Sequence, residues 1–250
     1  MVLNGREKLY ILVVIIKGGN FVKLKKYNIE PTSENVLNSI KDNTTGRNSA
    51  LSSFIEVIDH QYVSSLALNG DWGSGKTFFI KQAIMMLQYL NTDSGLDEAI
   101  RVELDRILSN TRNALQRPDI SNKYVVLYYD AWLYDDHKDP IQSLLYFMSI
   151  SLDKNYGIRS PDAKKLFLGA IETIAKWKNI DVTADMFMPE NHVEKIESLE
   201  DVKLSLQEAF HDLLDEKYSL VIFVDELDRC SPAYAIRFLE RVKHFLTVKM

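Results

Sequence analysis

The chain has 250 residues, of which 46% are hydrophobic and 26% charged, proportions that are typical of a globular domain. Its formal net charge of -5 argues against broad nonspecific binding to nucleic acid, which needs a basic surface. The single cysteine, Cys230, excludes an intrachain disulfide, and the scattered histidines predict no structural metal site. The longest apolar run, 9–16, is much shorter than the roughly 20 residues of a membrane helix, so we expect a cytoplasmic location.

The N-terminal part of the chain predicts a small extension and a linker. Residues 10–17 are rich in Ile and Val, a Gly-Gly-Asn turn follows, and residues 21–25 alternate between apolar and polar side chains. Two such runs around a glycine-rich turn are typical of a β-hairpin. Residues 28–48 are polar and contain several turn-forming residues, which predicts a linker. We therefore expect a hairpin and linker over 1–48 and one main domain over 49–250.

Apolar spacing next predicts three helices and a strand, with a glycine-rich loop after the strand. Apolar residues three and four positions apart indicate a helix over 50–60. Residues 65–68 are typical of a short buried strand, and they lead directly into the loop at 70–77. An apolar helical stretch follows at 78–90, and a further amphipathic helix is expected to end before Pro118.

The remaining sequence alternates between apolar strands and helices. Residues 124–129 and 220–224 are continuous apolar runs, which predict two further buried strands. Strands that alternate with helices in this way predict an α/β fold with a mostly parallel sheet. The helices expected in this part lie near 140–153 (after Asp139-Pro140), near 162–177, from Ser198 onward and over 231–246.

The loop at 70–77 reads Gly-Asp-Trp-Gly-Ser-Gly-Lys-Thr and matches the phosphate-binding pattern G-x-x-x-x-G-K-[ST] between a strand and a helix. Its glycines allow backbone N–H groups to point at an anion, and the helix N-terminus also favours negative charge. Lys76 would contact the β and γ phosphates, and the Thr77 hydroxyl would ligate Mg²⁺. The alternative is a glycine turn that binds nothing. The residues predicted to bind the nucleotide are Gly70, Asp71, Trp72, Gly73, Ser74, Gly75, Lys76, Thr77 and Phe78.

A second group of candidate residues follows the strand at 220–224. Ligands of parallel α/β sheets bind at the edge where the strands have their carboxyl ends. We expect Asp225 to bind Mg²⁺ and Glu226 to act as the general base for the attacking water, with Lys76 as the second catalytic residue. The alternative is a strand that runs into a solvated turn.

The next residues allow two interpretations. Asp228 and Arg229 either form a local ion pair in the turn or take part in the site. Cys230 is expected to be a small packed residue and not a nucleophile, because no histidine pairs with it in the sequence.

Three blocks of sequence together resemble the KAP family of P-loop NTPases: 66–77, with a tryptophan inside the loop, 129–134, with an Asp-Ala-Trp segment, and 224–232. The resemblance covers roughly residues 51–250 and implies an ATPase with a three-layer α/β/α fold, whose cofactors are ATP and Mg²⁺. The family commonly has Asp at position 226 and Asn at position 130, so the chain departs from the pattern at both. We expect Trp72 and Trp132 to pack or to brace loops, the alternative being direct contact with the nucleotide.

The resemblance also implies a fourth core strand between the strands at 65–68 and 220–224, which should follow the last helix. The chain stops at Met250, so we expect a fold that is incomplete at its C-terminus, with unpaired edges between those two strands. We therefore expect self-association or a protein partner to complete the site. Arg237 and Arg241 on the last helix are expected to be solvated or interface charges, the alternative being an arginine finger that reaches into a neighbouring subunit.

The leading functional hypothesis is an ATP-driven conformational switch in antiviral defence or the assembly of signalling complexes, with weak hydrolysis by the isolated protein. The second is a scaffold that binds nucleotide, or nothing, without hydrolysis. A GTPase or small-molecule kinase ranks lower, because the guanine-reading Asn-Lys-x-Asp motif is absent: Asn122-Lys123 continues with Tyr124 and Val125. A nucleic-acid motor is disfavoured by the acidic charge.

Overall fold

The structure is a computed structural model that describes residues 9–16, 30–60, 65–71, 73–91, 94–110, 114–136, 139–156, 169, 204 and 218–245. Within these residues, four strands form one sheet in the order β2-β1-β4-β3, and every neighbouring pair is parallel. The strands are β1 (Leu9–Ile16), β2 (Ser65–Gly70), β3 (Lys123–Asp130) and β4 (Tyr218–Asp225). The parallel sheet predicted from the alternation of strands and helices is confirmed.

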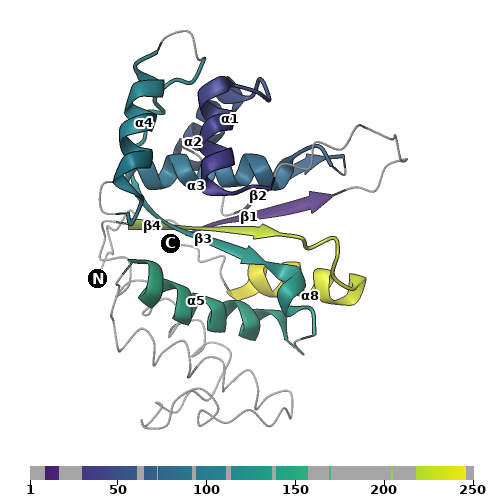
Figure 1. Cartoon of the computed structure of the whole chain (residues 1–250). Helices are drawn as coiled ribbons and strands as arrows, with labels where there is room; N and C mark the ends of the chain where they lie inside the picture. The colour runs from purple at the N-terminus through teal and green to yellow at the C-terminus, as the bar shows by residue number, and fades with distance from the viewer. Residues whose placement is uncertain are drawn as a thin grey trace.

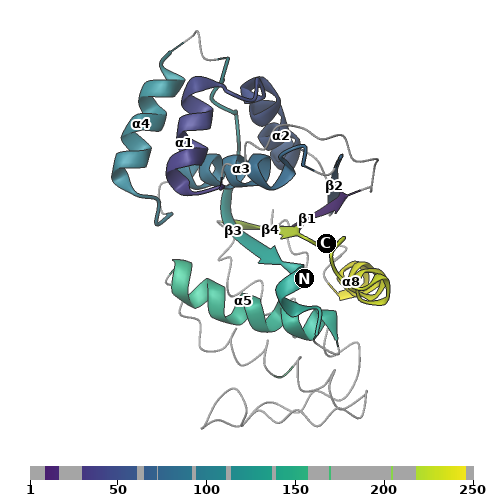
Figure 2. The ribbon, with the colours of Figure 1, turned by 45° about the vertical axis from the view of Figure 1, so that its right-hand side comes forward.

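Helices cover both faces of this sheet (Figure 1), and a view turned by 45° keeps the two groups on opposite sides (Figure 2). On one face lie α1 (Ser33–Asp42), α2 (Asn48–His60), α3 (Lys76–Leu90) and α4 (Glu98–Leu108). On the other face lie α5 (Pro140–Tyr156) and α8 (Pro232–Phe245), which pack against each other. A short 3₁₀ helix, η2 (Ala131–Tyr134), follows β3.

Most of the predicted helices correspond to helices of the structure. Those expected over 50–60, 78–90, 140–153 and 231–246 are α2, α3, α5 and α8. The helices expected near 162–177 and from Ser198 onward lie outside the described residues, apart from single positions in each. None of the described helices combines the length and the apolar character that crossing a membrane requires.

The main hydrophobic core lies between the sheet and the helices α1 to α4. β4 is buried along almost its whole length, as expected for a parallel strand that is covered on both faces. The amphipathic helices each add one apolar face to this core. The core includes Val36, Ile40, Leu51, Ile55, Ile80, Met86, Leu104, Tyr124, Val221 and Phe223.

β1 lies inside the sheet, which differs from the predicted N-terminal hairpin. It runs parallel to β2, with Ile16 opposite Gly70, and parallel to β4, with Val13 opposite Val224. Where these two pairings overlap, β1 has no edge left for a hairpin partner. The second arm of the predicted hairpin, residues 21–25, lies outside the described residues. The apolar run of β1 is continuous and not alternating, which is typical of a buried parallel strand and not of a two-stranded hairpin.

The position of β1 also changes the expectation of unpaired strand edges. β2 and β4 are not hydrogen-bonded to each other, as predicted. However, β1 pairs with both of them, so the expected seam of open edges is filled. Since neighbouring strands are about 4.8 Å apart, β1 separates the axes of β2 and β4 by about 10 Å.

The predicted linker over 28–48 contains a helix, α1. The Thr32 hydroxyl accepts a hydrogen bond from the Asn35 backbone N–H at 3.2 Å, which is a regular helix cap. Val36 and Ile40, one turn apart, are buried against the core, and α1 packs on α3 and α4. The helix ends at Asn43, whose φ of 48° is left-handed. The polar composition of this segment therefore belongs to the exposed face of a helix.

Candidate functional site

The loop between β2 and α3 has the backbone shape that an anion site requires. Gly73 and Gly75 have φ values of 76° and 82°, which residues with a side chain adopt only with strain. A methyl group on Gly70 would lie 3.0 Å from Ser74 Oγ, so a side chain at this position would require the Ser74 hydroxyl to shift. α3 begins at Lys76, and its cap residue, Gly75, provides no side-chain hydrogen bond to the first N–H groups. Trp72 lies outside the described residues.

Lys76 extends along the inside of this loop. Its ammonium group donates hydrogen bonds to the carbonyl oxygens of Gly70 at 2.7 Å and Asp71 at 2.6 Å and to Ser74 Oγ at 3.3 Å. Burial lowers the pKa of Lys76, while the carboxylates of Asp228 and Asp225 favour its charged form. Lys76 is thus a buried cation at the start of a helix, and its ammonium group is hydrogen-bonded to oxygen atoms of the loop. Phe78 packs against the core, so only its backbone N–H is suited to an anion.

Asp225 lies at the carboxyl end of β4, on the same sheet edge as the loop. It is fully buried, and its Oδ2 accepts a hydrogen bond from the Tyr128 hydroxyl at 2.9 Å. Its Oδ1 accepts one from the Glu226 backbone N–H at 2.9 Å. Asp130, at the end of β3, is its direct neighbour in register. The charge of Asp225 acts on Lys76, so the two parts of the predicted site lie near each other.

Glu226 is held by the residue three positions after it. Its φ of 58° is left-handed, and its Oε2 lies 2.6 Å from Arg229 Nε. That N–H is not aligned for a hydrogen bond, and this buried oxygen has no hydrogen-bond partner among the described residues. Burial raises the pKa of Glu226, and Arg229 partly opposes that effect. Glu226 is therefore a largely buried carboxylate that is paired with one cation and accepts no hydrogen bond at Oε2, which suits a base.

The other ambiguous residues of this turn are now assigned. Arg229 forms a local ion pair, but its partner is Glu226 and not Asp228. Asp228 is exposed, and its charge acts on Lys76. Cys230 is buried, and burial raises the pKa of its thiol to about 12, which agrees with a packed residue and not a nucleophile.

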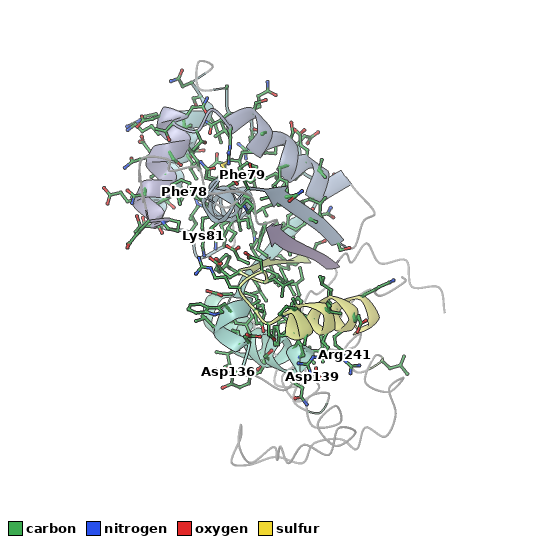
Figure 3. All side chains as sticks on the ribbon, turned by 90° about the vertical axis from the view of Figure 1, so that its right-hand side faces the viewer. Phe78, Phe79, Lys81, Asp136, Asp139 and Arg241 are labelled. Carbon is green, nitrogen blue, oxygen red and sulfur yellow. The ribbon has the colours of Figure 1, made fainter. Side chains whose placement is uncertain are left out.

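The structure also describes Trp132 and Arg241, for which the sequence left two interpretations. The side chain of Trp132 is half exposed, and the Arg229 guanidinium lies 5.8 Å from its ring centroid, so packing into a core is not its role. Arg241 Nε lies 3.8 Å from Asp139 Oδ2, and the two labelled side chains lie together between α5 and α8 (Figure 3). Arg241 therefore lies beside an acid of its own chain, while a third of its side chain remains exposed.

Sequence reasoning missed three residues beside the site. The Lys81 ammonium lies 3.1 Å from the centroid of the Tyr128 ring, and Tyr128 in turn contacts Asp225. Arg47 borders the loop, because a methyl group on Gly75 would lie 3.8 Å from its Nη1. The only available signal was position: Tyr128 precedes a strand end by two residues, and Lys81 lies one turn beyond Thr77.

The donor set fits a magnesium ion that is bound mainly through a nucleotide. Within the part of the chain that the structure describes, no cluster of three or more His, Cys, Asp or Glu side chains is arranged to bind a metal alone. Mg²⁺ keeps several waters and takes one or two protein ligands together with substrate phosphates. The Thr77 hydroxyl and the Asp225 carboxylate are the residues that would supply them.

Comparison with known proteins shows the family of the chain. Residues 47–250 match the KAP family P-loop domain. No curated protein and no solved structure matches the chain. The match includes the loop, both strand ends and the turn at Glu226, and it covers most of the 250 residues. The chain therefore belongs to the KAP family of P-loop NTPases.

Proposed function

We propose that this chain binds ATP together with Mg²⁺, hydrolyses ATP slowly and thereby acts as a conformational switch. The observation that carries the proposal is the shared sheet edge: Lys76 lies inside the glycine loop, and its ammonium is within range of the Asp225 charge. A polyphosphate needs the first group, and its magnesium needs the second.

Each residue has a distinct proposed role. Lys76 would exchange one of its three loop contacts for a phosphate oxygen, and the N–H groups at the start of α3 would add to its attraction. Thr77 and Asp225 would bind Mg²⁺, whose chemistry is to neutralise the charge that develops on the phosphates. Glu226, whose Oε2 is paired with Arg229 but accepts no hydrogen bond, would take the proton of the attacking water.

The binding part of this proposal is tested by titrating ATP and GTP, with Mg²⁺ and with EDTA, into wild-type protein, Lys76→Ala and Lys41→Ala. Lys41 pairs with Glu103 on the far helices, so it controls for the loss of one positive charge. We expect wild type and Lys41→Ala to bind ATP more tightly with Mg²⁺ than with EDTA. The affinity of Lys76→Ala for ATP with Mg²⁺ should be at least tenfold lower than that of wild type. Equal binding by all three proteins would reject the proposal.

The catalytic part is tested separately with Glu226→Gln. If the chain hydrolyses ATP, this variant should retain bound ATP through gel filtration, whereas wild type should retain ADP. The alternative function, a scaffold without hydrolysis, predicts the same nucleotide in both proteins.

The switch itself requires different assemblies in the two nucleotide states. We propose that the protein is cytoplasmic and self-associates, or binds a protein partner, in the ATP state, in antiviral defence or in the assembly of signalling complexes. Sedimentation of Glu226→Gln with ATP and of wild type with ADP tests this. Identical sedimentation at matched concentrations, with and without cell extract, would oppose it.

A further inference from the structure

Tyr128 connects the helix that begins at the phosphate loop to the carboxylate at the end of β4. Its hydroxyl donates a hydrogen bond to Asp225 Oδ2 at 2.9 Å. Its ring lies under the ammonium group of Lys81, which is 3.1 Å from the ring centroid. Lys81 belongs to α3, five residues after Lys76. The Tyr128 side chain of β3 therefore contacts Lys81 of α3 through its ring and Asp225 of β4 through its hydroxyl.

The hydrogen bonds to Asp225 fix the plane of its carboxylate. Oδ1 accepts the Glu226 backbone N–H and Oδ2 accepts the Tyr128 hydroxyl, both at 2.9 Å. Without the second bond, the carboxylate could rotate about its terminal torsion, which is broad for Asp. Each carboxylate oxygen offers two acceptor directions, so both oxygens keep one for a magnesium ion or its water. Tyr128 thus restricts the orientation of Asp225 and leaves its acceptor capacity available.

Lys81 restricts Tyr128 in the same manner. A cation over the face of a tyrosine ring is attracted by the ring's negative charge density, and the attraction grows when the pair is partly buried. Lys81 and Tyr128 are both half-buried, and Lys81 is labelled below α3, on the side toward the sheet, in Figure 3. Since α3 starts at the phosphate loop, this contact ties the Tyr128 ring to the element that would bind the phosphates.

We infer that Tyr128 is a positioning residue for magnesium: it orients Asp225 through its hydroxyl while Lys81 fixes its ring. This inference rests on the proposed function. The competing explanation is that Tyr128 is one more structural tyrosine of β3, like its neighbour Tyr129. The Tyr129 hydroxyl bonds to Ser143 and Tyr234 at 2.9 and 3.2 Å, away from Asp225. The two tyrosines therefore form a matched pair for substitution.

The test compares Tyr128→Phe with Tyr129→Phe, each of which loses one hydroxyl from the same strand. For wild type and both variants, the Kd of ATP is measured with EDTA and with saturating Mg²⁺, and unfolding is followed to control for stability. Outer-shell partners of metal ligands typically change metal affinity by about 10- to 100-fold. Mg²⁺ should lower the Kd of wild type for ATP. In Tyr128→Phe the ratio of the Kd with EDTA to the Kd with Mg²⁺ should be about tenfold or more smaller than in wild type, while the Kd with EDTA is unchanged. Tyr129→Phe should keep the wild-type ratio.

Three results would overturn the inference in distinguishable ways. If Tyr128→Phe keeps the wild-type ratio of the two Kd values, Tyr128 does not position Asp225. If it weakens both Kd values equally, its role is structural. If wild type itself binds ATP no better with Mg²⁺ than with EDTA, the proposed function fails, and the inference fails with it.

Discussion

Arg229 Nε lies 2.6 Å from Glu226 Oε2, and the same guanidinium lies 5.8 Å from the centroid of the exposed Trp132 ring. The arginine side chain is 45% exposed and that of the glutamate 17%, so a surface residue supplies the counter-ion of a largely buried carboxylate. In a protein that hydrolyses ATP through Glu226, this pair would set the pH at which the base becomes available.

Arg229→Gln should therefore shift the pH dependence of ATP turnover. Burial raises the pKa of Glu226, and Arg229 lowers it, so removing Arg229 raises this pKa further. Because the base must be deprotonated, the acid limb of the pH–rate profile should move to higher pH. Arg106→Gln is the matched control, since Arg106 pairs with Glu103 at the same spacing on α4, away from the site. An unchanged midpoint, or one at lower pH, would contradict the prediction.

Gly75→Ala should abolish tight ATP binding and lower the free energy of unfolding by about 1–2 kcal/mol, the cost of a left-handed φ for an L-residue. The φ of Gly75 is 82°, and its added methyl group would have room, so the penalty arises from the backbone and not from a clash. A relaxed φ would turn the N–H groups of the loop away from the phosphates. Calorimetric ATP titration and urea unfolding measure the two effects.

Asp59→Asn serves as the control for Gly75→Ala. This substitution should lower the free energy of unfolding by a similar amount. Asp59 contacts Ser121 near the amino end of β3, at the sheet edge opposite to the site. ATP affinity should stay at the wild-type level in this variant. A loss of affinity in both variants would show that ATP binding follows global stability and does not depend on the shape of the loop.

Local patterns in the sequence predicted individual elements and candidate residues, but they did not predict the place of β1 in the sheet. The loop at 70–77 and the acids after β4 are local patterns, in which neighbouring residues determine the backbone and the chemistry. The helix α1 was missed for a local reason as well, because its polar face outweighed Val36 and Ile40 in the composition of the segment.

The contacts between elements could not be read in the same way. β1 pairs with strands 50 or more residues away, and nothing in its own apolar run specifies those partners. The Lys81–Tyr128–Asp225 contact likewise joins α3, β3 and β4, so it can be predicted only when the order of the strands is known. Position alone hinted at it.

Arg47→Gln should weaken ATP binding by about tenfold, since one charge a few Å from a phosphate contributes on the order of 1–3 kcal/mol at partly screened sites. Arg47 borders Gly75, and its charge, after burial, is among the influences that lower the pKa of Lys76. The loss should be larger for ATP than for ADP and should shrink at high salt. Arg237→Gln, on an exposed face of α8, should bind as wild type does. Equal affinities in the two variants would remove Arg47 from the site.

Asp59→Asn should lower the free energy of unfolding at neutral pH by about 1.5–3 kcal/mol, the usual contribution of hydrogen bonds to a charged group. Asp59 is buried and accepts bonds from the Ser121 backbone N–H at 2.8 Å, from the Asn122 amide at 2.8 Å and from the Tyr124 hydroxyl at 2.5 Å. Burial raises the pKa of this carboxyl, but the hydrogen bonds outweigh burial, and the pKa lies below its ordinary value.

The sign of the pH dependence follows from that depressed pKa. The stability contributed by the charged Asp59 is fully present above the unfolded-state pKa of about 3.9 and is lost as the pH falls through the lower folded-state pKa. The difference in unfolding free energy between wild type and Asp59→Asn should therefore be constant near neutral pH and shrink below about pH 4. Urea unfolding at pH 7 and at about pH 3 measures it, with exposed Asp119→Asn as the control that should change little. A difference that grows on acidification would mean that the folded-state pKa of Asp59 lies above its unfolded-state value, because the folded protein would then bind the proton more readily than the unfolded chain.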